Sequence, residues 1–349
     1  MKERINYIDV LKAFAIYCVV LGHTCGRYGQ NIHPYITFYG LYPFHMPLFA
    51  VLSGLFFNYT IDTKTFLKKK FQQIALPQFV WCFIVAIVIR GVNESYLHFT
   101  EGYDIHFKSW IECYVMWVIA WGWWFLRALF LSFLYAYFSI KICKQNVLCG
   151  VTLSIILLYS LSLSGVIPNM KFMYFVFLYP FFSVGILIKE YKTLFYRNTK
   201  TIFWVALLIY LTSVCFWQGH DDTFYGMNTS MLEPTGNAGI TGTMVPLKII
   251  YRFITGVSGS IILILFAKWL STKLPSIPFI INIGRNTLGI YILHTFAFDL
   301  FNYRGNLFES EFLSIVFCLI IAAIITLISN SFVNFTSRYK VLRLLLWGK

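Results

Sequence analysis

The sequence predicts an all-α integral membrane protein, a polytopic bundle of about ten transmembrane helices with both termini in the cytoplasm. Hydrophobic residues make up 58% of the chain and charged residues only 12%, whereas globular domains carry about 25% charged residues. The mean hydropathy is +0.69, and the 20% of aromatic residues suits interfacial belts. A single transmembrane domain is therefore expected over residues 1–349.

Apolar runs close to the length of about 20 residues that crosses a bilayer follow one another along the chain. They fall near 7–25, 38–59, 74–90, 121–140, 147–164, 172–188, 201–217, 247–270, 279–300 and 311–334. With the N-terminus inside, most of the 28 Lys and Arg residues fall in inner segments and most acidic residues fall outside. This asymmetry follows the positive-inside rule. It explains the net charge of +14 without nucleic acid as a partner.

The first apolar run carries three ionisable residues: Asp9, Lys12 and His23. Such groups are costly inside a membrane and usually face the bundle interior or a water-filled cavity. Lys12 and His23 are separated by ~16 Å along a helix and lie within roughly 20° of one face. Asp9 precedes Lys12 by one turn, close enough to pair with it. The pattern favours a helix that grips a ligand at one end and moves a proton at the other.

Simpler interpretations of this run are a signal peptide, a Lys12 side chain that extends to the interface, and a His23 that only packs. A signal peptide is disfavoured because no small-residue cleavage site follows and many apolar runs come later. Lysines do extend to interfaces. However, a cation and an imidazole on one helix face, with an acidic neighbour, favour a functional role over these simpler interpretations.

His45 opens the second run and is expected at the depth of His23. Pro47 follows inside this run, and a proline there is tolerated where helices pack around a cavity. The sequence offers no third ligand near the two histidines and no C-x-x-C motif, so neither a metal site nor a disulfide framework is expected. The two histidines instead suggest a catalytic or substrate-orienting pair.

A basic segment with lysines at 64, 68, 69 and 70 precedes the third run. These lysines lie next to the apolar residues Phe66, Leu67 and Phe71, which predicts a basic interfacial helix. Two interpretations stay open: attraction to anionic membrane lipids, or a cradle for a phosphorylated cytoplasmic ligand.

Two further polar residues lie in later runs. Arg127 is buried near the outer end of the fourth run, and His294 lies at mid-depth in the ninth. Either is a functional candidate by default, although Arg127 could extend to the interface and His294 could simply pack. The long outer loops 91–120 and 218–246 suit sugar binding or are plain solvated loops.

Together these residues resemble membrane acyltransferase family 3, the integral membrane O-acyltransferases of bacterial glycans and their relatives. The resemblance rests on Asp9-x-x-Lys12 followed by ten residues and His23, Phe44-His-Met-Pro-Leu-Phe49 with Ser53-Gly54, the lysines before Pro77, Trp124-Phe-Leu126, and Gly284-Arg-Asn-Thr-Leu-Gly-Ile-Tyr-Ile-Leu-His294. There are two departures. Lys12 stands where the family usually has arginine, and its inner Arg-x-x-Arg appears only as Lys69-Lys70 before two glutamines. Lysine grips phosphate less well than the bidentate arginine.

The resemblance implies an acyl-CoA-dependent O-acyltransferase of the bacterial cytoplasmic (inner) membrane, with acetyl-CoA as co-substrate. Its acceptor would be a hydroxyl of a cell-envelope glycan or of a polyprenyl-linked sugar precursor. Lys12, Lys69 and Lys70 would meet the CoA phosphates, and His23 would be the general base.

Asp9 and Lys12 complete the expected catalytic set, and His45, Arg127 and His294 are the expected substrate-binding residues. His45 or Arg127 would supply the oxyanion donor. A protein-bound acyl-histidine is an open variant.

The competing class is a transporter or flippase for a sugar or lipid-linked sugar, in which the same polar groups would form a path. Against it, the chain shows neither an internal repeat nor paired Gly/Pro-interrupted runs in two halves. A scaffold or sensor without chemistry is disfavoured by the polar face of the first run. The sequence does not indicate the oligomeric state.

Overall fold

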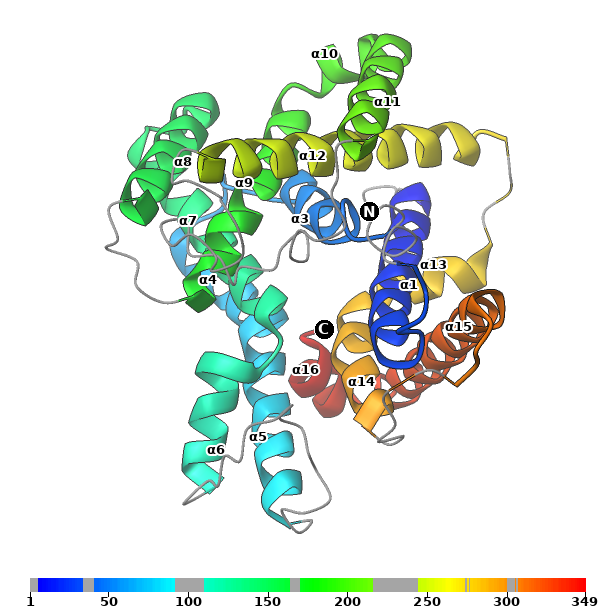
Figure 1. Cartoon of the computed structure of the whole chain (residues 1–349). Coiled ribbons are helices and arrows are strands. Elements are labelled where there is room, and N and C mark those ends of the chain that lie inside the picture. The colour runs from blue at the N-terminus through cyan, green and yellow to red at the C-terminus, as the bar shows by residue number, and fades with distance from the viewer. Residues whose placement is uncertain are drawn as a thin grey trace.

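The computed structural model describes the chain except at residues 1–5, 34–40, 92–109, 164–169, 216–243, 274, 276, 300–304 and 306. The described residues form helices and no strands (Figure 1). The helices are α1 Asn6–Tyr28, α3 His45–Leu55, α4 Thr63–Lys70, α5 Leu76–Gly91, α6 Trp110–Met116, α7 Trp124–Ile142, α8 Val147–Leu163, α9 Met170–Glu190, α10 Lys192–Arg197, α11 Thr199–Cys215, α12 Met244–Ser271, α13 Pro278–Arg285, α14 Thr287–Asp299, α15 Glu311–Thr336 and α16 Lys340–Trp347, with π-helical turns η1 Phe71–Ala75 and η2 Trp117–Trp121.

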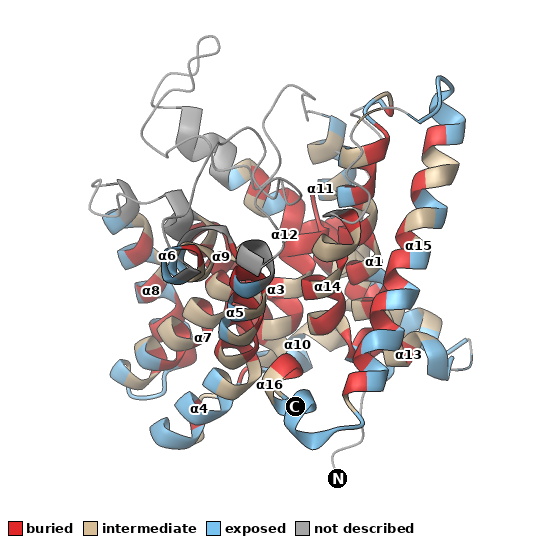
Figure 2. Ribbon diagram, turned by 90° about the horizontal axis from the view of Figure 1, so that it is seen from below, coloured by how far each residue is buried: buried red, intermediate tan, exposed pale blue. Residues whose placement is uncertain are grey.

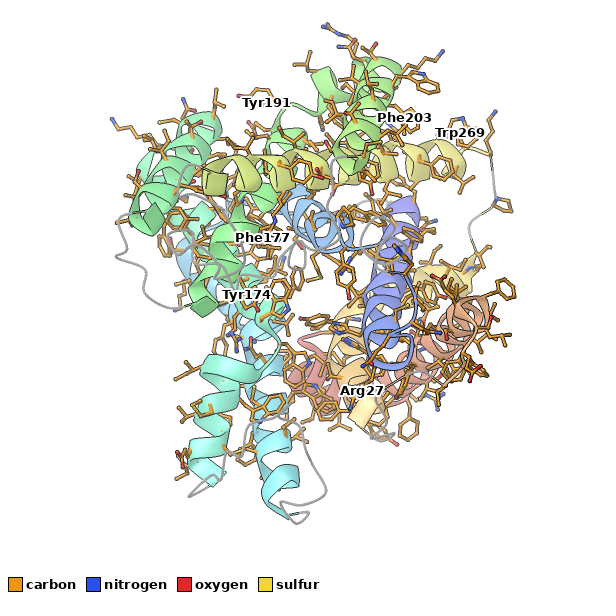
Figure 3. All side chains as sticks on the ribbon, in the orientation of Figure 1. Arg27, Tyr174, Phe177, Tyr191, Phe203 and Trp269 are labelled. Carbon is orange, nitrogen blue, oxygen red and sulfur yellow. The ribbon has the colours of Figure 1, made fainter. Side chains whose placement is uncertain are left out.

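The predicted all-helical class is confirmed, and within the described residues five helical segments are long and apolar enough to cross a membrane. They are Asn6–Tyr28, Thr63–Ile87, Trp124–Ile142, Ile250–Ser271 and Glu311–Thr336. Large apolar side chains such as Tyr191 and Trp269 are exposed on the bundle (Figure 3), which suits contact with lipid. The full set of ten spans and the side on which the termini lie stay predictions.

Two of the expected spans have helices shorter than the apolar run. In the second, α3 begins only at His45, so that Pro47 lies in its first turn, where proline is tolerated. The ninth is divided at Asn286 into α13 and α14. Hydropathy reports an apolar run but not a change of helix axis inside it.

A cluster of asparagine side chains supports the break at Asn286. The Asn286 amide donates to Oδ1 of Asn330 at 2.9 Å and of Asn334 at 2.8 Å. Asn334 donates to Asn282 at 2.9 Å, and the Lys349 ammonium donates to the Asn286 side chain at 3.0 Å. These bonds give the polar side chains at the break the protein partners that buried polar groups need.

Helix α1 occupies a central place, with contacts to α3, α12, α13, α14 and α15 (Figure 1). Gly284 of α13 lies directly against the backbone of Asp9. The Asp9 carboxylate, only 3% exposed, forms an ion pair with Arg285 at 3.4 Å. The Gly284-Arg285 part of the sequence motif in the ninth run is thus the docking surface for the start of α1.

Helix α3 is held by a close crossing with α9. Gly54 faces the Phe182 carbonyl, and Gly185 faces the Val51 carbonyl, so that either glycine would collide with the opposite backbone if it carried a Cβ. Small residues let helices approach closely in membranes. This crossing positions the face of α3 that carries His45 and Ser53.

Helix α16 returns the end of the chain to the end of the bundle at which α1 begins (Figure 2). Trp81 donates to the Leu346 carbonyl at 3.1 Å, and Trp347 donates to the Thr336 hydroxyl at 2.9 Å. Lys349 donates to the Arg285 carbonyl at 2.6 Å. The beginning of α1 and the end of the chain therefore share one anchoring region.

We expect Gly185→Ala to lower the thermal unfolding midpoint of the detergent-solubilised protein. The added methyl group overpacks the α3–α9 crossing, a change that typically costs about 1–3 kcal/mol. Gly26→Ala is the matched control, because nothing lies within 4 Å of a Cβ at that exposed helical glycine. The control should be neutral or stabilising by up to ~1 kcal/mol. Equal midpoints for the two variants would contradict the close crossing.

A double-mutant cycle with Asp9→Asn and Arg285→Gln should give a coupling free energy of about 0.5–1 kcal/mol in thermal unfolding, toward the low end of contacting pairs. The small value follows from the Arg285 side chain, which is 43% exposed and so is screened by solvent. The control cycle pairs Asp9→Asn with Arg338→Gln. Arg338 lies over the Phe335 ring, so the effects of these two substitutions on the free energy of unfolding should be additive. Additivity in both cycles would refute the ion pair.

Candidate functional site

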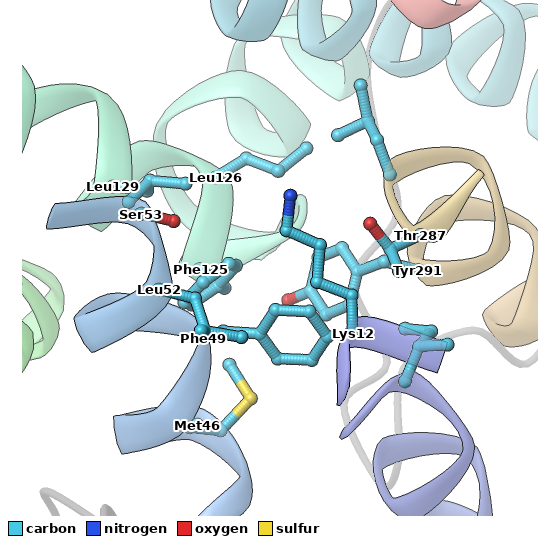
Figure 4. Close-up of a pocket in the computed structure, with 12 residues that line it drawn as sticks. Lys12, Met46, Phe49, Leu52, Ser53, Phe125, Leu126, Leu129, Thr287 and Tyr291 are labelled. Carbon is cyan, nitrogen blue, oxygen red and sulfur yellow. The ribbon is translucent and has the colours of Figure 1, made fainter. Parts of the chain in front are cut away.

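A cavity lies between α1, α3, α7 and α14, beside Lys12 (Figure 4). It has a volume of about 170 Å³, and its walls are mostly apolar with a few polar groups from Lys12, Ser53, Thr287 and Tyr291. The Lys12 ammonium lies 4.8 Å from the centroid of the Phe56 ring, a cation–π contact. Apolar pockets with few, placed polar groups are typical of ligand sites. The structure thus places the predicted cation at a cavity.

His23 and His294 form a pair of imidazoles between α1 and α14. Their ring centroids are 5.1 Å apart, with the planes tilted by 45°. His294 is 1% exposed, whereas His23 is exposed. The structure therefore brings together the expected general base and one expected substrate-binding residue, and leaves only the former accessible.

His45 lies next to the same part of α1. Its Nδ1 is 2.6 Å from the Leu41 carbonyl oxygen, and its ring packs edge-on against Tyr42 at 5.4 Å. The Tyr42 hydroxyl donates to the carbonyl of Gly22 at 3.3 Å, one residue before His23. This link is in keeping with a common depth for His45 and His23. Within the described residues, no cluster of three or more His, Cys, Asp or Glu could hold a metal ion.

Arg127 is half-buried and lies against the π-helical turn η2. Its guanidinium donates to the carbonyls of Val118 at 3.0 Å and Trp117 at 3.5 Å. The Trp117 carbonyl also accepts the Gly122 backbone N–H of the π-helical turn at 2.7 Å, so Arg127 is a second donor that ties its own side chain to η2. It does not line the Lys12 cavity, and its part in substrate binding stays a prediction.

The lysines of α4 face two environments. Asp62 caps the helix by accepting a hydrogen bond from the Thr65 backbone N–H at 2.9 Å, which holds the pKa of the Asp62 carboxyl below its usual range. Lys69 is exposed. Lys70 instead turns toward the bundle, with its ammonium 3.5 Å from the centroid of the Phe133 ring. The structure therefore separates two side chains that the sequence predicted to act together.

Three site features were not expected from the sequence: Arg285 as the partner of Asp9, and Thr287 and Tyr291 as lining of the cavity. The sequence did contain a pattern that indicates Thr287 and Tyr291. Thr287, Tyr291 and His294 follow one another at intervals of four and three residues, the spacing of one helix face. Most of the two outer loops, with His98 and His106, lies outside the described residues.

Comparisons with known proteins identify the family to which the chain belongs. The family described as "Acyltransferase domain", acyltransferase family 3, matches residues 5–330. Nodulation protein NolL of Sinorhizobium fredii (strain NBRC 101917 / NGR234) is 25% identical over 343 residues, covering 90% of this chain and 84% of that protein. No solved structure matches the chain. Because the family match covers nearly all of the helices that build the cavity and the histidine pair, the chain belongs to acyltransferase family 3 and is an acyltransferase that transfers groups other than aminoacyl groups.

Proposed function

We propose that the protein is an acyl-CoA-dependent O-acyltransferase of the bacterial cytoplasmic membrane. It transfers an acyl group, acetyl by family habit, to a hydroxyl of a cell-envelope glycan or of its lipid-linked precursor. The observation that carries the proposal is the arrangement of α1. One helix presents the Lys12 cavity and, ~16 Å further along its axis, an exposed imidazole, His23.

The inner end of the bundle suits the phosphates of the co-substrate. Lys69 on α4 is exposed, and Lys12 offers a second cation at the cavity. Lysine binds phosphate as a compact point charge. The pantetheine arm of acyl-CoA would then extend from these cations toward His23 and bring the thioester to the outer half of α1.

The chemistry at His23 is general-base catalysis. A neutral His23 takes the proton of the acceptor hydroxyl while the oxygen attacks the thioester carbonyl, a contribution of about 10²–10⁴-fold. The tetrahedral intermediate collapses by breaking the carbon–sulfur bond, and the CoA thiolate receives the proton from His23. His45 or Arg127 would donate to the oxyanion. A route through an acyl-histidine uses the same residue as nucleophile.

The first test is CoA thiol release from acetyl-CoA by the purified protein in nanodiscs, with and without a lipid-linked glycan extract. We expect release by the wild type that rises with the extract, and a loss of at least ~10²-fold in His23→Ala. His33→Ala is the matched control, because His33 is an exposed histidine that does not line the Lys12 cavity.

Full release by folded His23→Ala would refute His23 as the base. Uptake of labelled sugar into proteoliposomes without any need for acetyl-CoA would refute the enzyme and favour a transporter.

Lys12→Gln should raise the KM for acetyl-CoA by about tenfold, with a smaller effect on kcat, because it removes one charge-assisted contact worth about 1.5–3 kcal/mol. Lys192→Gln is the control, since Lys192 is an exposed lysine of α10 outside both the cavity and the basic segment of α4. Steady-state kinetics of CoA release measures both parameters. An unchanged KM in Lys12→Gln would remove Lys12 from the co-substrate site.

A further inference from the structure

We infer that His294 is a positioning residue for His23: its Nε2 accepts the N–H of the His23 ring, and so fixes the tautomer and orientation in which His23 meets the acceptor hydroxyl. The inference rests on the proposed function and reassigns His294, which the sequence predicted as a substrate-binding residue.

The hydrogen bond on the other side of the ring sets the protonation of His294. Nδ1 lies 3.2 Å from the carbonyl oxygen of Ile290, one helical turn earlier. A carbonyl oxygen only accepts, so Nδ1 carries the proton and donates. In a neutral imidazole the second nitrogen then has a bare lone pair. His294 Nε2 is therefore an acceptor.

This acceptor is buried without a partner. His294 is 1% exposed, and Nε2 has no hydrogen-bond partner among the described residues. A buried polar atom left unsatisfied costs about 1–3 kcal/mol, which a donor brought into range would recover. The unused lone pair is thus available for a bond that forms during the reaction cycle.

The rings around His294 identify the donor. The ring centroids of His23, Tyr291 and Phe298 lie 5.1, 5.7 and 6.0 Å from that of His294. Phe298 has no polar hydrogen. Tyr291 precedes His294 on the same helix, and its side chain lines the Lys12 cavity. Long side chains in a helix are directed toward the helix N-terminus, and for Tyr291 this direction leads away from His294. His23 is left as the donor.

For catalysis, this bond would determine which ring nitrogen of His23 acts as the base. When His23 donates through one ring nitrogen to His294, the other nitrogen presents its lone pair to the acceptor hydroxyl. The proton passes from that hydroxyl to His23 and then to the CoA sulfur, and His294 neither gains nor loses one. The bond strengthens as His23 becomes cationic, because charge-assisted hydrogen bonds are about twice as strong as neutral ones.

The test compares His294→Leu with His294→Gln in the CoA-release assay with acetyl-CoA and the lipid-linked glycan extract. The Gln side-chain oxygen can occupy the place of Nε2 and accept the bond, whereas Leu cannot. We expect kcat to fall about 10²-fold in His294→Leu, within the range of general-base effects, and at least tenfold of this loss to be recovered in His294→Gln. The KM for acetyl-CoA should not change in either.

Thr295→Ala is the control on the same helix, since the Thr295 hydroxyl bonds only its own turn, at the Ile292 carbonyl. It should retain wild-type kcat. Should His294→Leu fail to fold, His294→Asn replaces it. The Asn oxygen is too short to reach the Nε2 position, so its kcat should lie well below that of His294→Gln.

Equal losses in the acceptor and non-acceptor variants would overturn the inference, because shape alone would then matter. A raised KM with unchanged kcat would return His294 to substrate binding. The outcomes separate the inference from the proposed function. If His23→Ala abolishes release while His294→Leu retains kcat, only the inference fails. If the wild type releases no thiol, both fail.

Discussion

The rest of the structure depends on the need to satisfy polar groups along α1 inside an apolar bundle. Two of them are met from other parts of the chain, because Asp9 pairs with Arg285 and the Gly22 carbonyl accepts from Tyr42. The His23 ring packs against the His294 ring. Unsatisfied polar groups cost several kcal/mol in a membrane. These contacts therefore fix the register of α1 against α13, α14 and the segment before α3, which is also the register that builds the site.

The break at Asn286 connects this anchoring to the cavity. If α13 and α14 formed one continuous helix, their side chains would be arranged around a single shared axis. With the break, α13 packs on the start of α1, while α14 turns Thr287 and Tyr291 into the cavity and His294 toward His23. At the break, Lys349 donates to the Arg285 carbonyl, and the asparagine side chains donate to one another. Structural polarity is thus concentrated at one end, and the residues for chemistry lie further along.

The sequence predicted the helical membrane class and the common face of Lys12 and His23, because both depend on periodicity and hydropathy within one segment. It did not predict Arg285 as the partner of Asp9, since the two lie 276 residues apart and only tertiary packing joins them. It also treated Lys69 and Lys70 as one pair, although neighbouring helical residues point in directions ~100° apart and the structure turns only Lys70 onto Phe133. Lengths of apolar runs could not reveal the late start of α3.

The separation of charge along α1 follows from the same physics. A carboxylate beside His23 would orient it as in other general-base sites, but it would place a second ionised group in the membrane, where burying a charge is expensive. A neutral imidazole supplies the acceptor without that charge. Lys12 and the Asp9–Arg285 pair lie in the other half of the helix, where Arg285 reaches solvent, and the charge on the His23 side is the cation Arg27 in the last turn of α1. A histidine at position 294 is therefore the form of partner that the membrane favours for the general base proposed at His23, which begins each cycle neutral.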